Sequence, residues 1–182
     1  MTQAASAAPP DGAAKAKALE TSARALAERH RPLVRAPSSR TRFVEASRVT
    51  RALEYAHRHL AVTPGKDAAL PRAAEWFLDN YYLIRRVARQ IKEDLPPGFA
   101  RRLPWVGTGG FRVELLAGEL VTTMRLELDP ASLRSYIAAY QAAAPLTIAE
   151  LWALPTMLRT CVLRHLVRFL DELHIQIGRA HV

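Results

Sequence analysis

The chain has 182 residues, of which 49% are hydrophobic and 24% charged, so it is long enough to bury a core and has the composition of a globular protein. Its 26 Lys and Arg residues outnumber its 17 Asp and Glu residues, and the net charge of +9 favours contact with phosphates of nucleic acid or of lipid headgroups. The single cysteine excludes an internal disulfide and a cysteine-based metal site, and no apolar run is long enough to span a membrane.

The first forty residues are rich in Ala, Ser, Pro and charged residues and offer little apolar surface to bury. Residues 13–29 have the composition of a helix, although their apolar residues are mostly Ala. Pro32 and the segment Ala36-Pro37-Ser38-Ser39 then interrupt the chain. We therefore predict a largely disordered basic leader over residues 1–40.

From residue 42 onward, apolar residues recur at steps of three and four, which is the spacing of a helix with one buried face. The first such stripe comprises Phe43, Ala46, Val49, Leu53, Ala56 and Leu60. A helix over residues 70–94 follows, with Pro71 in its first turn and a predicted buried face of Ala73, Trp76, Phe77, Ile84, Val87, Ala88 and Ile91. Residues 101–110 are rich in Gly and Pro and predict an irregular linker.

Three further helices are predicted after the linker. The first spans residues 111–127, and the second begins at the cap Asp129-Pro130 and continues through residue 144. The third begins at the capping box formed by Thr147 and Glu150 and extends to about residue 173, with a kink or a break at Pro155. No stretch alternates like a strand. The predicted fold class is all-α: an irregular multi-helix bundle over residues 41–176, preceded by the leader.

The sequence contains no pattern that predicts catalysis. His57 and His59 are two positions apart on a helix, so they point in different directions and are poorly placed to share a metal. Gly107-Thr108-Gly109-Gly110 lacks the Lys and Ser/Thr of a phosphate-binding loop. Cys161 lies in an apolar stretch and is interpreted as a small buried hydrophobe. We therefore assign no catalytic, cofactor-binding or metal-binding residue.

The segment from Arg24 to Arg58 contains nine arginines against Glu28, Glu45 and Glu54. One interpretation is a surface that faces lipid headgroups or nucleic acid. The other, which we favour, is a solvated face in a protein whose composition is generally rich in Arg.

The last six residues, Ile177-Gly178-Arg179-Ala180-His181-Val182, can be reverse-translated as ATC GGA AGA GCA CAC GTC, which is a common sequencing-adapter sequence. We interpret residues 177–182 as an artefact and exclude them from fold reasoning. On this interpretation the natural protein continues past Gln176, and the chain is a fragment of it.

Two stretches resemble bacterial cyclic β-1,2-glucan synthases. The first motif, Ala74-Glu75-Trp76-Phe77-Leu78-Asp79-Asn80-Tyr81-Tyr82-Leu83-Ile84, is similar to a signature near the N-terminus of that family, and Asp94-Leu95-Pro96-Pro97-Gly98-Phe99 follows at a similar spacing. The second motif, Pro145-Leu146-Thr147-Ile148-Ala149-Glu150-Leu151-Trp152-Ala153-Leu154-Pro155, resembles a second family segment, with Ala149 where Gly is usual.

The resemblance implies a large inner-membrane protein that transfers glucose from UDP-glucose, with a divalent metal, to build and cyclise β-1,2-glucan. The sugar-nucleotide and acceptor motifs of such an enzyme are absent from this chain, so no catalytic residue is carried over. The implied role is a noncatalytic helical scaffold on the cytoplasmic side of the membrane, in contact with the remaining domains of the parent polypeptide and with anionic lipid headgroups. The alternative is a free-standing basic helical module that binds nucleic acid, which the resemblance disfavours.

The motif residues themselves are interpreted as architectural. We predict that Trp76 and Trp152 are buried, because each carries a large apolar area. Asp79 and Asn80 are expected to make polar contacts at a junction between helices. Thr147 and Glu150 are expected to fix the start of the last helix, and Pro155 its bend.

Overall fold

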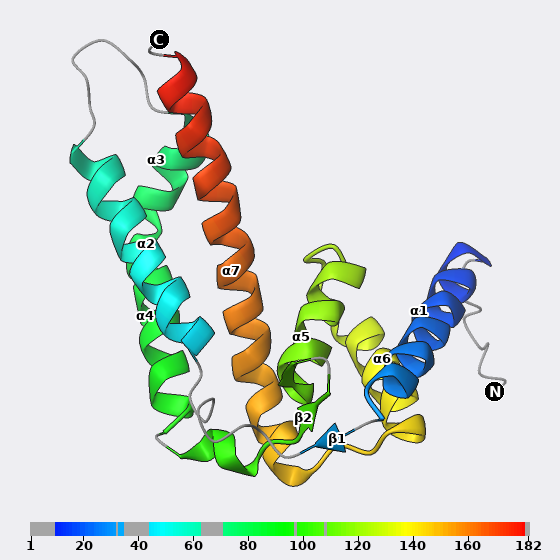
Figure 1. Cartoon of the computed structure of the whole chain (residues 1–182). Coiled ribbons are helices and arrows are strands. Elements are labelled where there is room, and N and C mark those ends of the chain that lie inside the picture. Colours follow the sequence, from blue (N-terminus) through cyan, green and yellow to red (C-terminus); the bar gives the residue numbers. More distant parts are fainter. Residues whose placement is uncertain are drawn as a thin grey trace, which may run out of the picture.

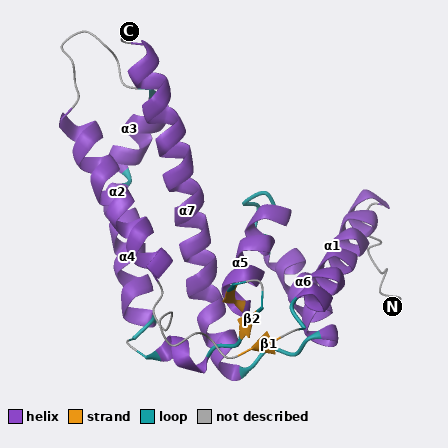
Figure 2. Ribbon diagram, viewed as in Figure 1, coloured by secondary structure: helices purple, strands orange, loops and turns teal. Residues whose placement is uncertain are grey.

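The computed structural model describes residues 10–31, 33–34, 44–62, 71–96, 98–107 and 109–180, and side chains within 14–31, 33–34, 45–62, 71–96, 98–107 and 109–173. Most of these residues are helical, as predicted (Figure 2). The helices are α1 (Pro10–Arg29), α2 (Val44–Val62), α3 (Arg72–Asp79), α4 (Tyr81–Asp94), the 3-10 turn η2 (Phe99–Arg102), α5 (Arg112–Thr123), α6 (Pro130–Ala143) and α7 (Ile148–Ala180). Three two-residue strands are β1 (Leu33–Val34), β2 (Trp105–Val106) and β3 (Gly110–Phe111).

The helices form two arms that meet at the base of the molecule (Figure 1). Helices α2 and α4 pack on the C-terminal part of α7 in the first arm, and α3 packs on α2 and α4. In the second arm, α5 packs on the N-terminal part of α7, and α6 lies between α5 and α1. The side chains of α7 belong to two separate cores, because Met157 and Cys161 lie in one and Leu163 and Leu170 in the other. Helix α7 therefore connects the two arms.

The core of the first arm follows the predicted helical spacing. Val49, Leu53 and Leu60 of α2 are buried, as are Phe77 of α3 and Ile84 of α4. Phe43, the first residue of the predicted α2 stripe, lies outside the described residues. The stripe on α2 was thus a sufficient signal for this part of the core.

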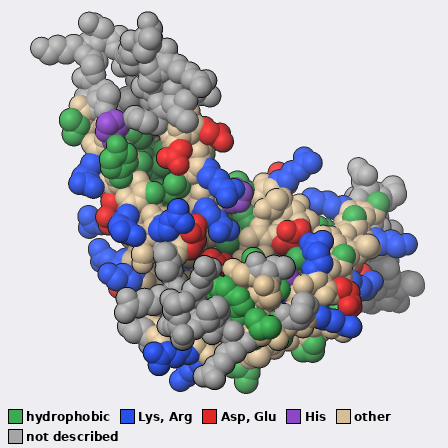
Figure 3. Space-filling view, viewed as in Figure 1, with side chains coloured by type: hydrophobic (Ala, Val, Ile, Leu, Met, Phe, Trp, Pro, Cys, Tyr) green, Lys and Arg blue, Asp and Glu red, His purple; other side chains and the backbone are tan. Residues whose placement is uncertain are grey.

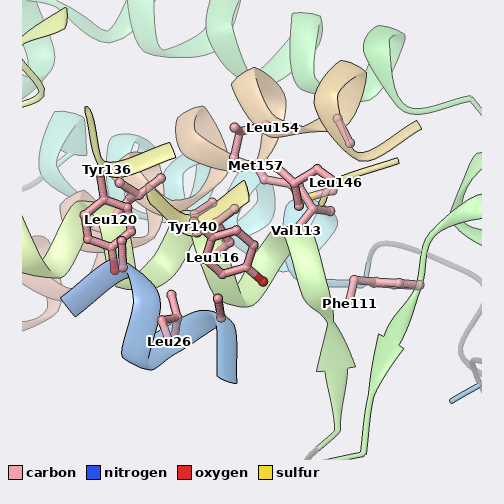
Figure 4. Close-up of a cluster of buried hydrophobic side chains, with 14 of the residues drawn as sticks. Leu26, Phe111, Val113, Leu116, Leu120, Tyr136, Tyr140, Leu146, Leu154 and Met157 are labelled. Carbon is pink, nitrogen blue, oxygen red and sulfur yellow. The ribbon is translucent and has the colours of Figure 1, made fainter. Parts of the chain in front are cut away.

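Helix α1 corrects the prediction of a disordered leader. The helix suggested over residues 13–29 is confirmed, but it packs along α6 and contributes to the core of the second arm (Figure 4). Leu19 and Leu26 are buried, and Ala23 and Ala27 are fully buried. The small alanine side chains allow a close approach of the helices, which offsets their small apolar area. The prediction of disorder over residues 1–40 is therefore wrong for Pro10–Arg29, whereas residues 1–9 and 35–40 lie outside the described part of the chain.

The prediction of a structure without strands is also corrected. Strand β2 pairs antiparallel with both β1 and β3, in the order β1-β2-β3. Trp105 packs edge-on against Phe111 with ring centroids 5.0 Å apart, and Gly109 turns the chain between them with φ +105°. Strands of two residues are too short to show an alternating pattern in the sequence.

Two predictions about breaks within helices are corrected by the structure. The helix expected over residues 70–94 is divided at Asn80, which has φ −99° and ψ 5° and ends α3 while it begins α4. Conversely, α7 continues through Pro155 as one helix, so the predicted break is absent. Pro155 is at the eighth position of α7, and the packing of that helix in both cores holds it together.

Candidate functional site

The second motif lies at the start of α7 and forms the capping box that its sequence predicts. The backbone N–H of Thr147 donates to Glu150 Oε2 at 2.8 Å, and the backbone N–H of Glu150 donates to Thr147 Oγ1 at 3.3 Å. The Thr147 hydroxyl also lies 3.0 Å from Glu150 Oε2. The predicted role of these two residues in fixing the start of α7 is confirmed.

Glu150 is more than a cap, because its side chain is fully buried and paired with Arg112 of α5. Arg112 Nε donates to Glu150 Oε1 at 2.7 Å, and Arg112 Nη2 donates both to Glu150 Oε2 and to the carbonyl oxygen of Pro145 at 2.9 Å. The hydrogen bonds that Arg112 donates to the Glu150 carboxylate raise the pKa of Arg112 above its ordinary value. Both charges are thus desolvated but compensated by bidentate geometry, which is what an ion pair requires inside a protein.

A second buried polar pair lies close to this ion pair. His30, just after α1, is 5% exposed, and its Nδ1 lies 2.9 Å from the hydroxyl of Tyr140 on α6. Burial, together with the positive charges of Arg29 and Arg112, lowers the pKa of His30 to about 4. Burial also raises the pKa of Tyr140 to about 12. Both side chains are therefore neutral at physiological pH.

These two pairs connect α1, α5, α6 and α7 within the second arm. All four side chains are buried, so a substrate has no direct access to the charges. The arrangement is suited to fixing the positions of the helices and not to acid–base catalysis. Glu150 was identified from the sequence through its spacing from Thr147, whereas Arg112 and His30 were missed because their partners are 38 and 110 residues away.

The motif tryptophans contradict the prediction that both are buried. Trp76 is 57% exposed and Trp152 is 78% exposed, whereas Trp105, in the predicted linker, is only 7% exposed. On α3, both Trp76 and Phe77 were predicted on the buried face, but only Phe77 is buried. On α7, the face toward the core is occupied by Ala153 and Leu154.

The start of α7 exposes two more large apolar residues beside Trp152. Ile148 is 77% exposed and Leu151 is 42% exposed. Positions separated by three and four residues share one helix face, so Ile148, Leu151 and Trp152 form a contiguous surface, here called the α7 apolar face. Pro155 continues the same face one turn later and is exposed. A contiguous exposed apolar surface of this kind is a feature of interaction sites.

The polar residues of the first motif lie where α3 meets α4. Asn80 Nδ2 donates to the carbonyl oxygen of Trp76 at 2.8 Å, so the predicted polar contact of Asn80 at a helix junction is confirmed. Asp79 is exposed and lines an open pocket on the surface of the first arm.

The two histidines of α2 and the single cysteine make packing contacts within the fold. The ring of His57 stacks on Tyr81 with centroids 3.7 Å apart, and the ring of His59 stacks on Tyr55 at 5.6 Å. Cys161 is buried, as predicted, and burial raises its pKa to about 11. Among the described residues, no group of three or more His, Cys, Asp or Glu is placed to hold a metal ion. Within the same ranges, no helix is sufficiently long and apolar to cross a membrane.

The described arginines of the segment from Arg24 to Arg58 are divided between the two arms. Its first residues lie on α1 in the second arm and its last on α2 in the first arm (Figure 1). Four of its arginines have carboxylate partners: Arg24 with Glu20, Arg29 with Glu119, Arg31 with Glu28 and Arg48 with Glu45. This pairing supports the interpretation as a solvated face.

The chain is similar to a known glucan synthase over part of its length. It is 30% identical over 115 residues to the cyclic beta-(1,2)-glucan synthase NdvB of Rhizobium meliloti (strain 1021). The match covers 62% of this chain but only 4% of that protein. No family model matches the chain. The resemblance to cyclic β-1,2-glucan synthases is thus confirmed for a region of such a protein, and the region is helical.

Proposed function

We propose that this chain is a noncatalytic helical region of a larger cyclic β-1,2-glucan synthase and that it packs against another segment of the same polypeptide through the α7 apolar face. The observation that carries the proposal is the exposure of Trp152 at 78% within the motif that resembles the synthase family. The fold does not need this side chain for its core, so its presence is best explained by a contact outside the fold. Tryptophan contributes disproportionately to protein interfaces.

We propose that the segment in contact with the α7 apolar face is another part of the synthase, because the match covers only a small part of the known relative. With 4% of NdvB accounted for, nearly all of that polypeptide lies outside the matched region. The face is apolar over Ile148, Leu151 and Trp152, which suits a permanent contact within one chain. The UDP-glucose-dependent activity, its metal, and the location at the cytoplasmic side of the inner membrane are proposed for the whole synthase through the resemblance.

A chimeric synthase tests the proposal. The matched region of NdvB is replaced by this chain, and the amount of protein in the membrane fraction is measured together with glucan synthesis from UDP-glucose. We expect the double variant Leu151→Ala/Trp152→Ala to lower protein amount and glucan synthesis in parallel, with unchanged linkage of the product. Tyr55→Ala is the matched control, since Tyr55 is 59% exposed on α2 and outside both motifs.

Two results would contradict the proposal. Unchanged protein amount and synthesis in the double variant would show that the α7 apolar face makes no essential contact. Unchanged protein amount with abolished synthesis would give the face a direct part in catalysis. The isolated chain is expected neither to hydrolyse UDP-glucose nor to transfer glucose from it.

A further inference from the structure

The junction of α3 and α4 contains an open pocket of about 530 Å³. Its lining comes from α2, α3 and α4: His57, Leu78, Asp79, Tyr81, Tyr82, Arg85, Arg86 and Arg89. The first motif supplies four of these residues: Leu78, Asp79, Tyr81 and Tyr82. The pocket exists because the chain bends at Asn80, where α3 ends and α4 begins.

The charge of the pocket is predominantly positive. Arg85, Arg86 and Arg89 lie within one and a half turns of α4 and are all exposed. Within the part of the chain that the structure describes, none of the three forms an ion pair with a carboxylate, unlike four of the arginines between Arg24 and Arg58. Figure 3 shows several Lys and Arg side chains over the same arm. Like charges at this spacing repel each other, and a bound anion removes that repulsion.

The aromatic residues give the pocket a defined wall. Tyr81 is held between two rings, because it stacks on His57 at 3.7 Å and packs edge-on against Phe77 at 5.7 Å. Tyr82, by contrast, is 68% exposed at the mouth of the pocket. Its hydroxyl can donate a hydrogen bond to an anion, as the guanidinium groups do. Asp79 is the single acidic residue of the lining, so the three arginines outnumber it.

We propose that this pocket binds a phosphate ester, with Arg86 and Arg89 as the principal phosphate contacts. Guanidinium groups donate paired hydrogen bonds that match the oxygens of a phosphate. The ester is either a lipid headgroup or a soluble phosphate compound, since both present the same group. The proposal concerns α4 and does not depend on the α7 apolar face.

Binding is measured on the whole chain by calorimetry with pyrophosphate as the soluble probe. The pocket variant is Arg86→Gln/Arg89→Gln. Arg101→Gln/Arg134→Gln is the control, because it removes the same charge from two exposed arginines outside the pocket. We expect saturable binding that the pocket variant weakens at least about tenfold and the control changes by less than about threefold. Thermal unfolding of each variant confirms that the fold is retained, since all four arginines are exposed.

Asp79 provides a test of opposite sign. Asp79→Asn removes the only negative charge of the lining, so we expect it to tighten pyrophosphate binding by about two- to fivefold. Weaker binding in this variant would contradict a phosphate held by the neighbouring arginines. A purely structural defect at the junction of α3 and α4 would weaken binding in both Asp79→Asn and the arginine variant, which separates the two explanations.

Vesicles distinguish the source of the phosphate. Cosedimentation is measured with phosphatidylcholine alone and with an equimolar mixture of phosphatidylcholine and phosphatidylglycerol. Binding to the mixed vesicles that is lost in the pocket variant and displaced by pyrophosphate supports a lipid headgroup. Saturable pyrophosphate binding without pocket-dependent vesicle binding supports a soluble phosphate compound. Duplex DNA serves as a further anionic probe. The proposal is overturned if pyrophosphate binding does not saturate. It is also overturned if the pocket variant and the control variant lose equal affinity for pyrophosphate, vesicles and duplex DNA, because net charge alone then explains the binding.

Discussion

The pair of Arg112 and Glu150 allows a quantitative test of what holds the second arm together. Replacing Arg112 by Met keeps an unbranched side chain out to about the position of Nε but removes the guanidinium group. The Glu150 carboxylate, which is fully buried, then has only Thr147 as a partner. An uncompensated buried charge costs about 3–5 kcal/mol. A domain of ordinary stability has about 5–15 kcal/mol in total, so Arg112→Met is expected to remain folded but with a much lower urea midpoint.

The double variant Arg112→Met/Glu150→Gln removes both charges and keeps a residue that can complete the capping box. Its expected loss is about 1–2 kcal/mol, from hydrogen bonds that the amide does not replace. The double variant should therefore be more stable than either single variant. Urea unfolding followed by circular dichroism measures all three, with Arg134→Met as an exposed control that is expected to change stability by about 0.5 kcal/mol or less. Single variants that each lose under about 1 kcal/mol, or a double variant that loses the sum of the two, would refute the reasoning.

Three further predictions concern burial. Trp152→Ala and Trp76→Ala should each change the free energy of unfolding by less than about 1 kcal/mol, whereas Trp105→Ala should cost about 3–5 kcal/mol in the same urea experiment. Burial lowers the pKa of His30 from 6.5 to about 4, so between these pH values the unfolded chain takes up a proton that the folded chain excludes. The contribution of neutral His30 to the free energy of unfolding is therefore fully present above pH 6.5. It decreases by about 3 kcal/mol as the pH falls to about 4. His30→Phe should remove that part of the slope, and an unchanged slope would contradict a buried neutral His30. Cys161, with its pKa raised to about 11, should react with iodoacetamide at pH 8 only in urea, so rapid labelling of the folded protein would contradict its burial.

The buried face of α2 was predictable from the sequence. The spacing of Val49, Leu53 and Leu60 reveals a buried face directly, because a helix repeats every 3.6 residues. Local hydrogen bonds were equally predictable: Asp129 accepts from the backbone N–H groups of Ala131 and Ser132, and Thr147 and Glu150 cap each other, as their spacing indicates. Each of these features depends on residues only a few positions apart.

Interactions between distant residues were decided by the tertiary structure alone. Helix α1 looked too poor in large apolar residues to be ordered, and only its contact with α6 shows that alanines such as Ala23 and Ala27 are core residues. Arg112 looked like one of many surface arginines, and only the fold places it opposite Glu150. The exposed tryptophans follow the same rule, because a helical stripe two residues wide does not say whether Trp76 or Phe77 faces the core.

The sequence by itself determined that the chain is helical, where most of its helices begin, and which synthase family it resembles, since local spacing, capping and motif identity are written in neighbouring residues. Only the tertiary structure decided which side of each motif faces outward. It turned Trp152 from a predicted core residue into part of the α7 apolar face, and it brought His57 of α2 beside Tyr81 and the arginines of α4 in one pocket. The physical reason is that burial and charge pairing depend on the packing partners of a helix, which lie far away along the chain.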